Sequence, residues 1–119
     1  MPQELTPLTL TDSNFDQEVL QVKDTLVIVD FWAVWCGPCR IMEPILDEVI
    51  ENYKNNPKIK VGKVNVDEND VVTERYSIRS IPTTKFFLNG EEATEDILGA
   101  VPKEVIVAKI NQVLEKVEA

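Results

Sequence analysis

Residues 26–40 read Leu26-Val27-Ile28-Val29-Asp30-Phe31-Trp32-Ala33-Val34-Trp35-Cys36-Gly37-Pro38-Cys39-Arg40 and place a cysteine pair shortly after a nearly continuous apolar run. The part from Leu26 to Trp32 is almost entirely β-branched, aliphatic or aromatic, which predicts a central strand buried on both faces. Asp30 is the exception, because a carboxylate inside such a strand is costly to bury. The two cysteines then fall where this strand ends and the next element begins.

The segments on either side predict further helices and strands. From Cys39 onward, apolar residues recur at steps of three and four, which predicts a long amphipathic helix that kinks at Pro44 and ends at Asn55-Asn56-Pro57. Asn89-Gly90 tolerates positive φ and predicts a tight hairpin turn between two antiparallel strands. The remaining predicted elements are a strand at 8–11, a helix capped by Asp12-Ser13 with apolar positions Phe15, Val19 and Val22, a strand at 59–66, a helix capped by Asn69-Asp70 that runs to Tyr76, strands at 83–88 and 93–98, and a closing helix from Pro102 to Val117.

The order of these elements, βαβαβαββα, predicts the fold class. Strands separated by helices pair in parallel, whereas the final hairpin pairs antiparallel. We therefore expect an α/β protein in which a mixed central sheet is flanked by helices on both faces. The chain has 119 residues and shows no linker or repeat, so residues 1–119 are expected to form a single domain.

The acidic composition disfavours some classes of partner. With a formal net charge of −9, the chain lacks the basic surface that binding to nucleic acid or to an anionic membrane requires. The longest apolar run, Leu26 to Val29, is too short to span a bilayer, and Met1 to Thr6 has no basic stretch or apolar signal core. A cytoplasmic location is the simplest expectation, although a secreted or organellar chain whose presequence had been removed would look the same.

A Cys-x-x-Cys pair serves as half of a metal site, as a static disulfide or as a redox dithiol. A closed zinc site needs four ligands, and this chain has 0 His and only 2 Cys, so we expect no metal. A bridge across two residues would constrain little of the unfolded chain and is a weak staple. The redox interpretation is favoured, because Cys36 at the start of a helix would lie close to unpaired N–H groups that stabilise a thiolate. In this interpretation Cys36 attacks a substrate disulfide and Cys39 resolves the mixed disulfide.

Two segments carry a resemblance to a known family. Residues 29–40 resemble the active-site segment of thioredoxins, and Ile81-Pro82-Thr83 resembles their cis-proline loop. The likeness covers nearly the whole chain. It implies the thioredoxin fold and a general reductant of protein disulfides that works through a redox-active Cys36–Cys39 disulfide without a bound cofactor. It also implies electron transport and cell redox homeostasis as the setting, disulfide-containing client proteins, a reductase that uses NADPH or ferredoxin, and a monomer.

The resemblance also implies roles for two charged residues. The neighbours of Asp30 predict its burial, and burial of an unpaired carboxylate raises its pKa. By resemblance, Asp30 is the buried acid that relays a proton for Cys39, through water. Lys63 on the adjacent predicted strand resembles the lysine that family members place near this acid, or it is simply exposed.

The resemblance further implies a shallow apolar groove that receives client proteins and the reductase. A cis bond at Pro82 would bring the backbone of Ile81 beside the cysteines and present peptide groups to an extended substrate. The implied groove residues are Trp35, Ile81, Pro82, Gly99 and Ala100. Gly99 has an alternative interpretation, in which it only relieves backbone strain.

Four further residues are expected to tune or support the site. Gly37 and Pro38 lie between the cysteines, and a restricted backbone there changes the relative stability of dithiol and disulfide. Their identity resembles that of the reducing members of the family. Trp32 is interpreted equally as a core residue and as support for the active site, and Pro44 as structural support within the helix.

Two features leave alternatives open. Lys85 falls in a strand where relatives usually show an apolar residue, so either it lies on a partly exposed edge or a bulge shifts the register. The segment 91–96 is about one residue longer than the common hairpin. The rival function is a redox-insensitive or redox-gated binding module, in which the same groove holds a partner protein and turnover is incidental.

Overall fold

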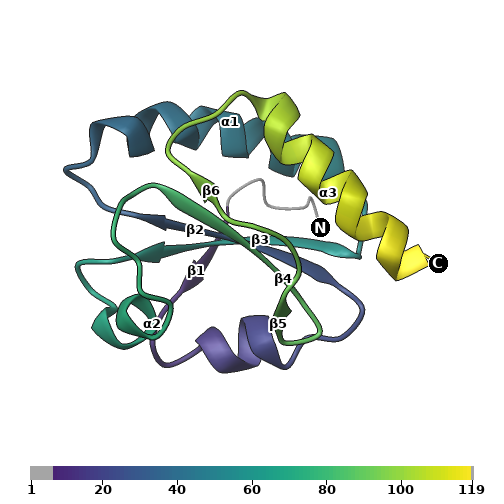
Figure 1. Cartoon of the computed structure of the whole chain (residues 1–119), viewed down its shortest axis with the longest axis horizontal. Helices are drawn as coiled ribbons and strands as arrows, with labels where there is room; N and C mark the ends of the chain where they lie inside the picture. The colour runs from purple at the N-terminus through teal and green to yellow at the C-terminus, as the bar shows by residue number, and fades with distance from the viewer. Residues whose placement is uncertain (1–6, 119) are drawn as a thin grey trace.

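A mixed six-stranded sheet forms the centre of the computed structural model, which describes residues 7–118, with side chains to residue 116 (Figure 1). The elements in chain order are β1 (Leu8–Leu10), the π-helix η1 (Asp16–Leu20), β2 (Leu26–Trp32), α1 (Gly37–Tyr53), β3 (Ile59–Asn65), α2 (Asp70–Arg75), β4 (Thr83–Leu88), β5 (Glu91–Glu92), β6 (Ile97–Leu98) and α3 (Lys103–Glu118). The predicted α/β class is confirmed. The side chain of Val117, assigned to the stripe of the closing helix, lies outside the described residues.

Strand β2 occupies the middle of the sheet, as its apolar sequence predicts. The strand order is β1-β3-β2-β4-β5, and β6 pairs with β4 as well. Strands β1 and β2 both pair with β3 in parallel, whereas β4 is antiparallel to β2, β5 and β6. In this register Asp30 stands beside Lys63 of β3 on one side and Thr84 of β4 on the other. The predicted mixed sheet is therefore confirmed. The prediction that strands separated by helices pair in parallel is wrong for β4, which follows α2 and is antiparallel to β2.

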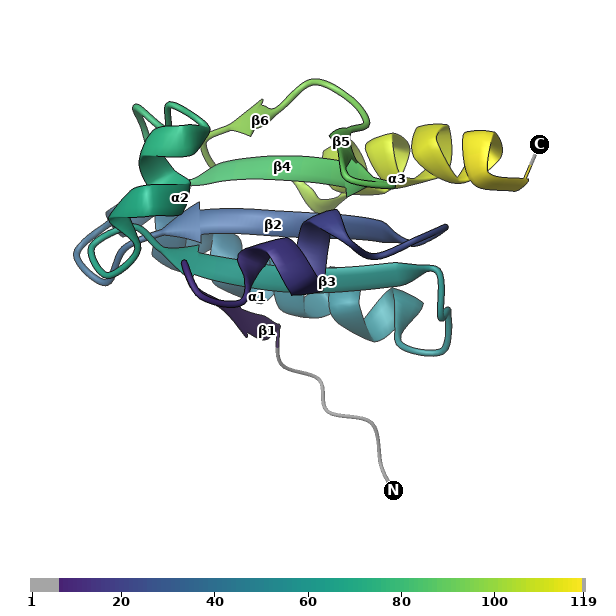
Figure 2. The same cartoon turned by 90° about the horizontal axis from the view of Figure 1, so that it is seen from below.

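Helices cover both faces of the sheet, and each face has its own core (Figures 1 and 2). Alternation along β2 sends Leu26 and Ile28 toward α1 and α3, and Val27, Val29 and Phe31 toward η1 and α2. The first core also contains Met42, Leu46, Val49, Phe86, Ile97, Ile106, Ile110 and Val113. The second contains Leu10, Phe15, Val19, Val64, Val72 and Phe87. Burial of these apolar side chains is the main term that stabilises the fold.

The predicted helix caps were wrong in their pairing. Asp12 does not cap the helix that follows it; its carboxylate accepts hydrogen bonds from the backbone N–H groups of Val71 and Val72 at the start of α2. Asn69, predicted as a cap of α2, instead accepts the backbone N–H of Asp12 through its side-chain oxygen. The two segments are far apart in sequence, and the parallel pairing of β1 with β3 brings them together. A capping residue from another element is invisible to a local sequence pattern.

The hairpin turn is confirmed, but the predicted strand at 93–98 is confirmed only at its end, where β6 (Ile97–Leu98) pairs with β4. Asn89 and Gly90 both have positive φ, at 53° and 84°, and join β4 to β5. The second strand is then interrupted at 93–96, and the register against β4 shifts by two residues between β5 and β6. Of the two alternatives for Lys85, the bulge is confirmed and the exposed edge is wrong, because Lys85 is 4% exposed. Its Nζ bonds to Glu92 at 2.7 Å and to Asp96 at 3.0 Å, and the bulge supplies the second carboxylate.

The two long helices match their predicted positions. Helix α1 continues through Pro44, which is exposed, and the kink there remains a prediction. Helix α3 begins one residue after Pro102, whose carbonyl accepts the N–H of Val105. Within residues 7–118, no helix combines the length and the apolar character needed to cross a membrane.

Candidate active site

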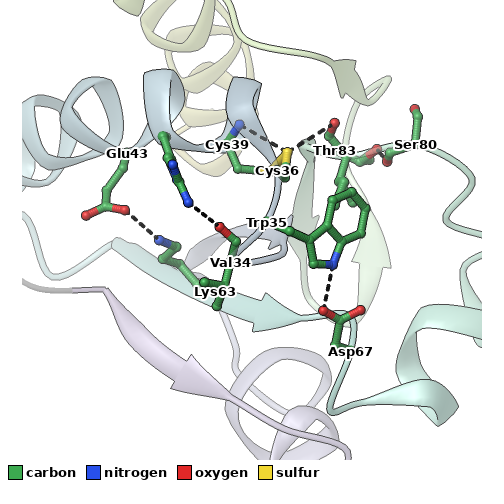
Figure 3. Close-up of a disulfide and its surroundings, with 11 residues drawn as sticks. Val34, Trp35, Cys36, Cys39, Glu43, Lys63, Asp67, Ser80 and Thr83 are labelled. Atoms are coloured by element: carbon green, nitrogen blue, oxygen red, sulfur yellow. Dashed lines mark hydrogen bonds and ion pairs between the residues drawn. A yellow bond between two sulfur atoms is a disulfide. The ribbon is translucent and has the colours of Figure 1, made fainter.

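Cys36 is the N-cap residue of α1, between the end of β2 and the first turn of the helix. Its Sγ accepts a hydrogen bond of 3.2 Å from the backbone N–H of Cys39, and the two cysteines form a disulfide (Figure 3). This confirms the predicted position at a strand–helix junction. When the disulfide is reduced, the donated N–H and the positive end of the helix dipole both stabilise negative charge on Sγ of Cys36.

The loop before β4 reaches the disulfide. The peptide bond between Ile81 and Pro82 is cis, as the resemblance implied, and Pro82 is buried. The carbonyl oxygen of Ile81 lies 3.7 Å from Sγ of Cys36. The backbone N–H of Gly99 donates a 2.8 Å hydrogen bond to the carbonyl of Pro82, which ties the end of β6 to the same loop. Gly99 has φ of 84°, a conformation that favours glycine, so the backbone alone accounts for this residue type.

Asp30 is buried beneath α1, with 1% of its surface exposed. Burial raises its pKa from the usual 3.8 to about 6, while the Lys63 cation opposes the shift and the Glu43 carboxylate adds to it. The expected burial and the expected direction of the shift are both confirmed. A carboxyl group with this pKa changes its protonation state slightly below neutral pH.

Lys63 is held between two neighbours of Asp30 rather than extended into solvent. Its side chain is 17% exposed, and its Nζ lies 4.0 Å from Glu43 Oε2 (Figure 3). The same Nζ lies 4.4 Å from the centre of the Trp32 ring, a cation–π distance. Trp32 also packs on the small cluster formed by Ala33, Cys36 and Cys39. Trp32 therefore packs against the cluster that contains the cysteines and lies within cation–π distance of the lysine.

Trp35 lies at the surface beside the cysteine pair, with 68% of its area exposed. Its indole Nε1 donates a 2.8 Å hydrogen bond to Asp67 Oδ2, on the loop after β3 (Figure 3). The Arg40 guanidinium donates to the carbonyl of Val34 at 3.2 Å and braces the same loop from the helix side. An exposed aromatic side chain held by a specific hydrogen bond is a ready contact surface for another protein.

Comparison with known proteins places this geometry in a family. The sequence model of the family described as Thioredoxin matches residues 6–112. The chain belongs to the thioredoxin family. Thioredoxin 1 of Nostoc sp. is 50% identical over 107 residues, which cover 90% of this chain and 92% of that protein. The thioredoxin of Alicyclobacillus acidocaldarius is 44% identical over 108 residues, covering 91% and 98% of the two chains. The chloroplastic M-type thioredoxin of Pisum sativum is 46% identical over 103 residues, which cover 87% of this chain and 58% of that protein.

Family membership and the cysteine geometry together establish the activity class. The chain is a thiol–disulfide oxidoreductase that acts on protein disulfides, and Cys36 and Cys39 are its redox pair. Thioredoxins work with disulfide-containing client proteins and with a reductase, and they need no bound cofactor. Within residues 7–118, no cluster of three or more His, Cys, Asp or Glu side chains could hold a metal ion. The expectation that the chain binds no metal stays a prediction.

The remaining predicted thioredoxin site residues lie around the cysteines in different ways. Gly37 and Pro38 are exposed at the first turn of α1, between the two cysteines. Ala100 is exposed and follows Gly99 in the chain, which is bonded to the cis-proline loop. Pro44 is placed outside this cluster, further along α1.

Sequence reasoning missed Asp67 and Glu43. Asp67 follows β3 at the edge of the sheet where the parallel strand β2 also ends, and this shared edge was the available signal. Glu43 follows Cys39 by four residues, the spacing that places two side chains on one face of a helix. Neither signal identifies the residue that the carboxylate contacts. Asp67 meets Trp35, and Glu43 meets Lys63, only in the folded structure.

Proposed function

We propose that this thioredoxin is a general reductant of protein disulfides, in which Cys36 is the attacking cysteine and Cys39 the resolving one. The observation that carries the assignment is the hydrogen bond from the Cys39 N–H to Sγ of Cys36. The cysteines are 3% and 5% exposed, so exposure does not separate their roles. The helix N-terminus does, because its N–H groups stabilise a thiolate at the N-cap position.

The reaction then has two steps. The Cys36 thiolate attacks one sulfur of a client disulfide, which forms a mixed disulfide and releases the other client sulfur as a thiolate. Cys39 loses its proton and attacks Sγ of Cys36, which forms the Cys36–Cys39 disulfide and releases the second client thiolate. Two electrons pass from the dithiol to the client. The oxidised chain is recharged by a reductase that uses NADPH or ferredoxin.

Asp30 is proposed as the group that accepts the proton of Cys39, through water, in the second step. Its pKa of about 6 leaves it mostly ionised at neutral pH yet basic enough to take a proton. Lys63, beside it in the register of β2 and β3, stabilises the ionised form. Trp32 supports the same arrangement, since its ring contacts both the cysteine cluster and Lys63.

Client recognition is assigned to the surface around Cys36. The carbonyl of Ile81 beside the sulfur offers a backbone acceptor to an extended client segment, which is a small-scale form of strand addition. The other groove residues are proposed to be Trp35, Pro82, Gly99 and Ala100. Gly37 and Pro38 are proposed to tune the redox equilibrium, and Pro44 to support α1. The chain is further proposed to form a single domain, to act as a monomer in the cytoplasm, and to contribute to electron transport and redox homeostasis.

A binding role that does not need turnover is the second candidate. The observation in its favour is the exposed Trp35, held in place by Asp67 next to the disulfide. A partner that packs on this indole would be held whether or not the cysteines react. The two roles share one surface and differ in their need for thiols.

An insulin-reduction assay with dithiothreitol as electron source separates the two roles. We expect the parent protein to accelerate the precipitation of reduced insulin, and Cys36→Ser and Cys39→Ser each to reduce that acceleration to the background rate. Both variants should still bind any partner that uses the Trp35 surface alone. Acceleration that survives either substitution would refute the dithiol mechanism.

A further inference from the structure

Two buried polar atoms near the active site have no hydrogen-bond partner among the residues that the structure describes. They are Oδ1 of Asp30 and Oγ1 of Thr84. The two residues are 1% and 0% exposed. A buried polar group without a partner is destabilising, and most buried polar atoms in proteins are paired. Two such atoms in one place therefore need a common explanation.

The sheet register places these two side chains next to each other. Asp30 of β2 and Thr84 of β4 are directly opposite in an antiparallel pair. Side chains of directly opposed residues project from the same face, with Cβ atoms roughly 4.5–5.5 Å apart. The next pair on this face, Ile28 and Phe86, is buried in the core beneath α1 and α3. Thr84 therefore projects from the face of the sheet that α1 and α3 cover, the same face from which Asp30 projects.

Neighbouring residues of β4 do not compete for this position. Alternation sends Lys85 to the opposite face, where Glu92 and Asp96 hold its Nζ. The hydroxyl of Thr83 is already engaged, because it donates to the carbonyl of Ser80 at 2.7 Å. Thr84 is thus the hydroxyl of β4 that remains to pair with the carboxyl group.

A hydroxyl suits this place for a chemical reason. It donates a hydrogen bond to an ionised carboxylate and accepts one from a protonated carboxyl group, so it pairs with Asp30 in both states. The charged groups that act on Asp30 are Lys63 from β3 and Glu43 from α1. Both act on the carboxyl group through their charge. Thr84 is neutral and stays a partner throughout a proton transfer.

We propose that Thr84 is a positioning residue for the resolving step: its hydroxyl pairs with the Asp30 carboxyl group through one water molecule in both protonation states. This inference rests on the proposed role of Asp30 as proton acceptor for Cys39. The pairing fixes the orientation of the carboxyl group while its proton comes and goes. It also favours the ionised form, since a hydrogen bond to a charged acceptor is stronger than one to a neutral group.

The test compares Asp30 in variants that differ by one hydroxyl. Thr84→Val removes the hydroxyl and keeps the shape, and should raise the pKa of Asp30 by about half a unit to one unit. Because Thr84→Val could also perturb folding, Thr84→Ala and Thr84→Ser form a second pair in which both lose the methyl group and only Ser keeps the hydroxyl. Thr73→Val is the matched control, since its hydroxyl donates to the carbonyl of Asn69 within α2, on the other face.

Two readouts are needed, both on the full chain. NMR titration of the Asp30 carboxyl carbon gives its pKa in the reduced and oxidised protein. Stopped-flow oxidation of the reduced protein by excess peptide disulfide gives the pH profile of the resolving step. We expect the profile to move to higher pH with the pKa in Thr84→Val and Thr84→Ala, and to stay near that of the parent in Thr84→Ser and Thr73→Val.

The outcomes separate this inference from the function on which it rests. Unchanged Asp30 pKa values in Thr84→Val and Thr84→Ala, with Asp30→Asn still slowing the resolving step, would overturn the role of Thr84 alone. An unchanged resolving rate in Asp30→Asn would overturn the proton-acceptor role and this inference with it. A pKa that rises in both hydroxyl-free variants and returns with serine supports the assignment.

Discussion

Asp30 and Lys63 are direct neighbours in the parallel pairing of β2 and β3, yet the pKa of Asp30 is still raised to about 6. Burial therefore outweighs the attraction of the lysine. The Nζ of Lys63 also interacts with Glu43 and with the Trp32 ring, which limits how far it lowers the pKa of Asp30. This balance leaves a carboxyl group that titrates close to the working pH of a general base.

Asp30→Asn should slow the resolving step at pH 7 by about tenfold to a hundredfold. The parent rate should rise with pH through the pKa of Asp30, because the carboxylate is the proton-accepting form, and the variant should lack this rise. Stopped-flow oxidation by a saturating peptide disulfide between pH 5 and 8 measures it. Asp47→Asn, on an exposed position of α1, is the control. Equal profiles for Asp30→Asn and the parent would exclude the proposed relay.

The same substitution should stabilise the fold at neutral pH. The pKa of Asp30 is higher in the folded chain than the usual 3.8, so its contribution is most favourable below pH 3.8 and is lost as pH rises through about 6. At pH 7 the buried carboxylate therefore costs up to about 3 kcal/mol. Urea unfolding at pH 7 and pH 4 should show a more stable Asp30→Asn at pH 7, and a much smaller difference at pH 4. A variant that is less stable than the parent at pH 7 would contradict this account.

Lys85 gives a prediction about a buried charge that is remote from the chemistry. The double variant Glu92→Gln with Asp96→Asn leaves a buried ammonium without a carboxylate and should lower the free energy of unfolding by about 1–3 kcal/mol. Glu92 is 46% exposed, which keeps the loss below that of a fully buried pair. Lys85→Met removes the charge itself and should stay within about 1 kcal/mol of the parent. If Lys85→Met lowered the free energy of unfolding more than the double variant does, the two carboxylates would not be needed to compensate the buried charge, and the account would be contradicted.

Asp12 should contribute more to the stability of helix α2 than Asp70, the first residue of that helix, does. Asp12→Ala removes the acceptor of two backbone N–H groups, from Val71 and Val72, and should destabilise the chain by about 1 kcal/mol. Asp70→Ala changes an exposed carboxylate of the same helix and should cost less. Thermal unfolding of both variants provides the comparison. If Asp70→Ala destabilised the chain more than Asp12→Ala, the local cap predicted from the sequence would matter more than Asp12, and this prediction would be contradicted.

The parts of the structure that could be predicted are those that depend on local pattern. The apolar run of β2, the helix that starts at the cysteines and the Asn89-Gly90 turn each carry their own signal, and each is confirmed. The cap that Asp12 provides, the bond from Trp35 to Asp67 and the carboxylates around Lys85 were not predicted. Each of these joins segments that only the folded sheet brings together, and single residues in a sequence do not name such partners.

The assignment of attacker and resolver is tested most directly by trapping the mixed disulfide. Cys39→Ser keeps Cys36 and its N-cap environment but cannot resolve, so it should accumulate covalent complexes with a disulfide-containing client such as insulin. Cys36→Ser retains only Cys39 and should trap far less. Non-reducing gel electrophoresis and mass spectrometry of the linked peptide would show bonds through Cys36. Equal trapping by the two variants, or linkage through Cys39 alone, would contradict the account.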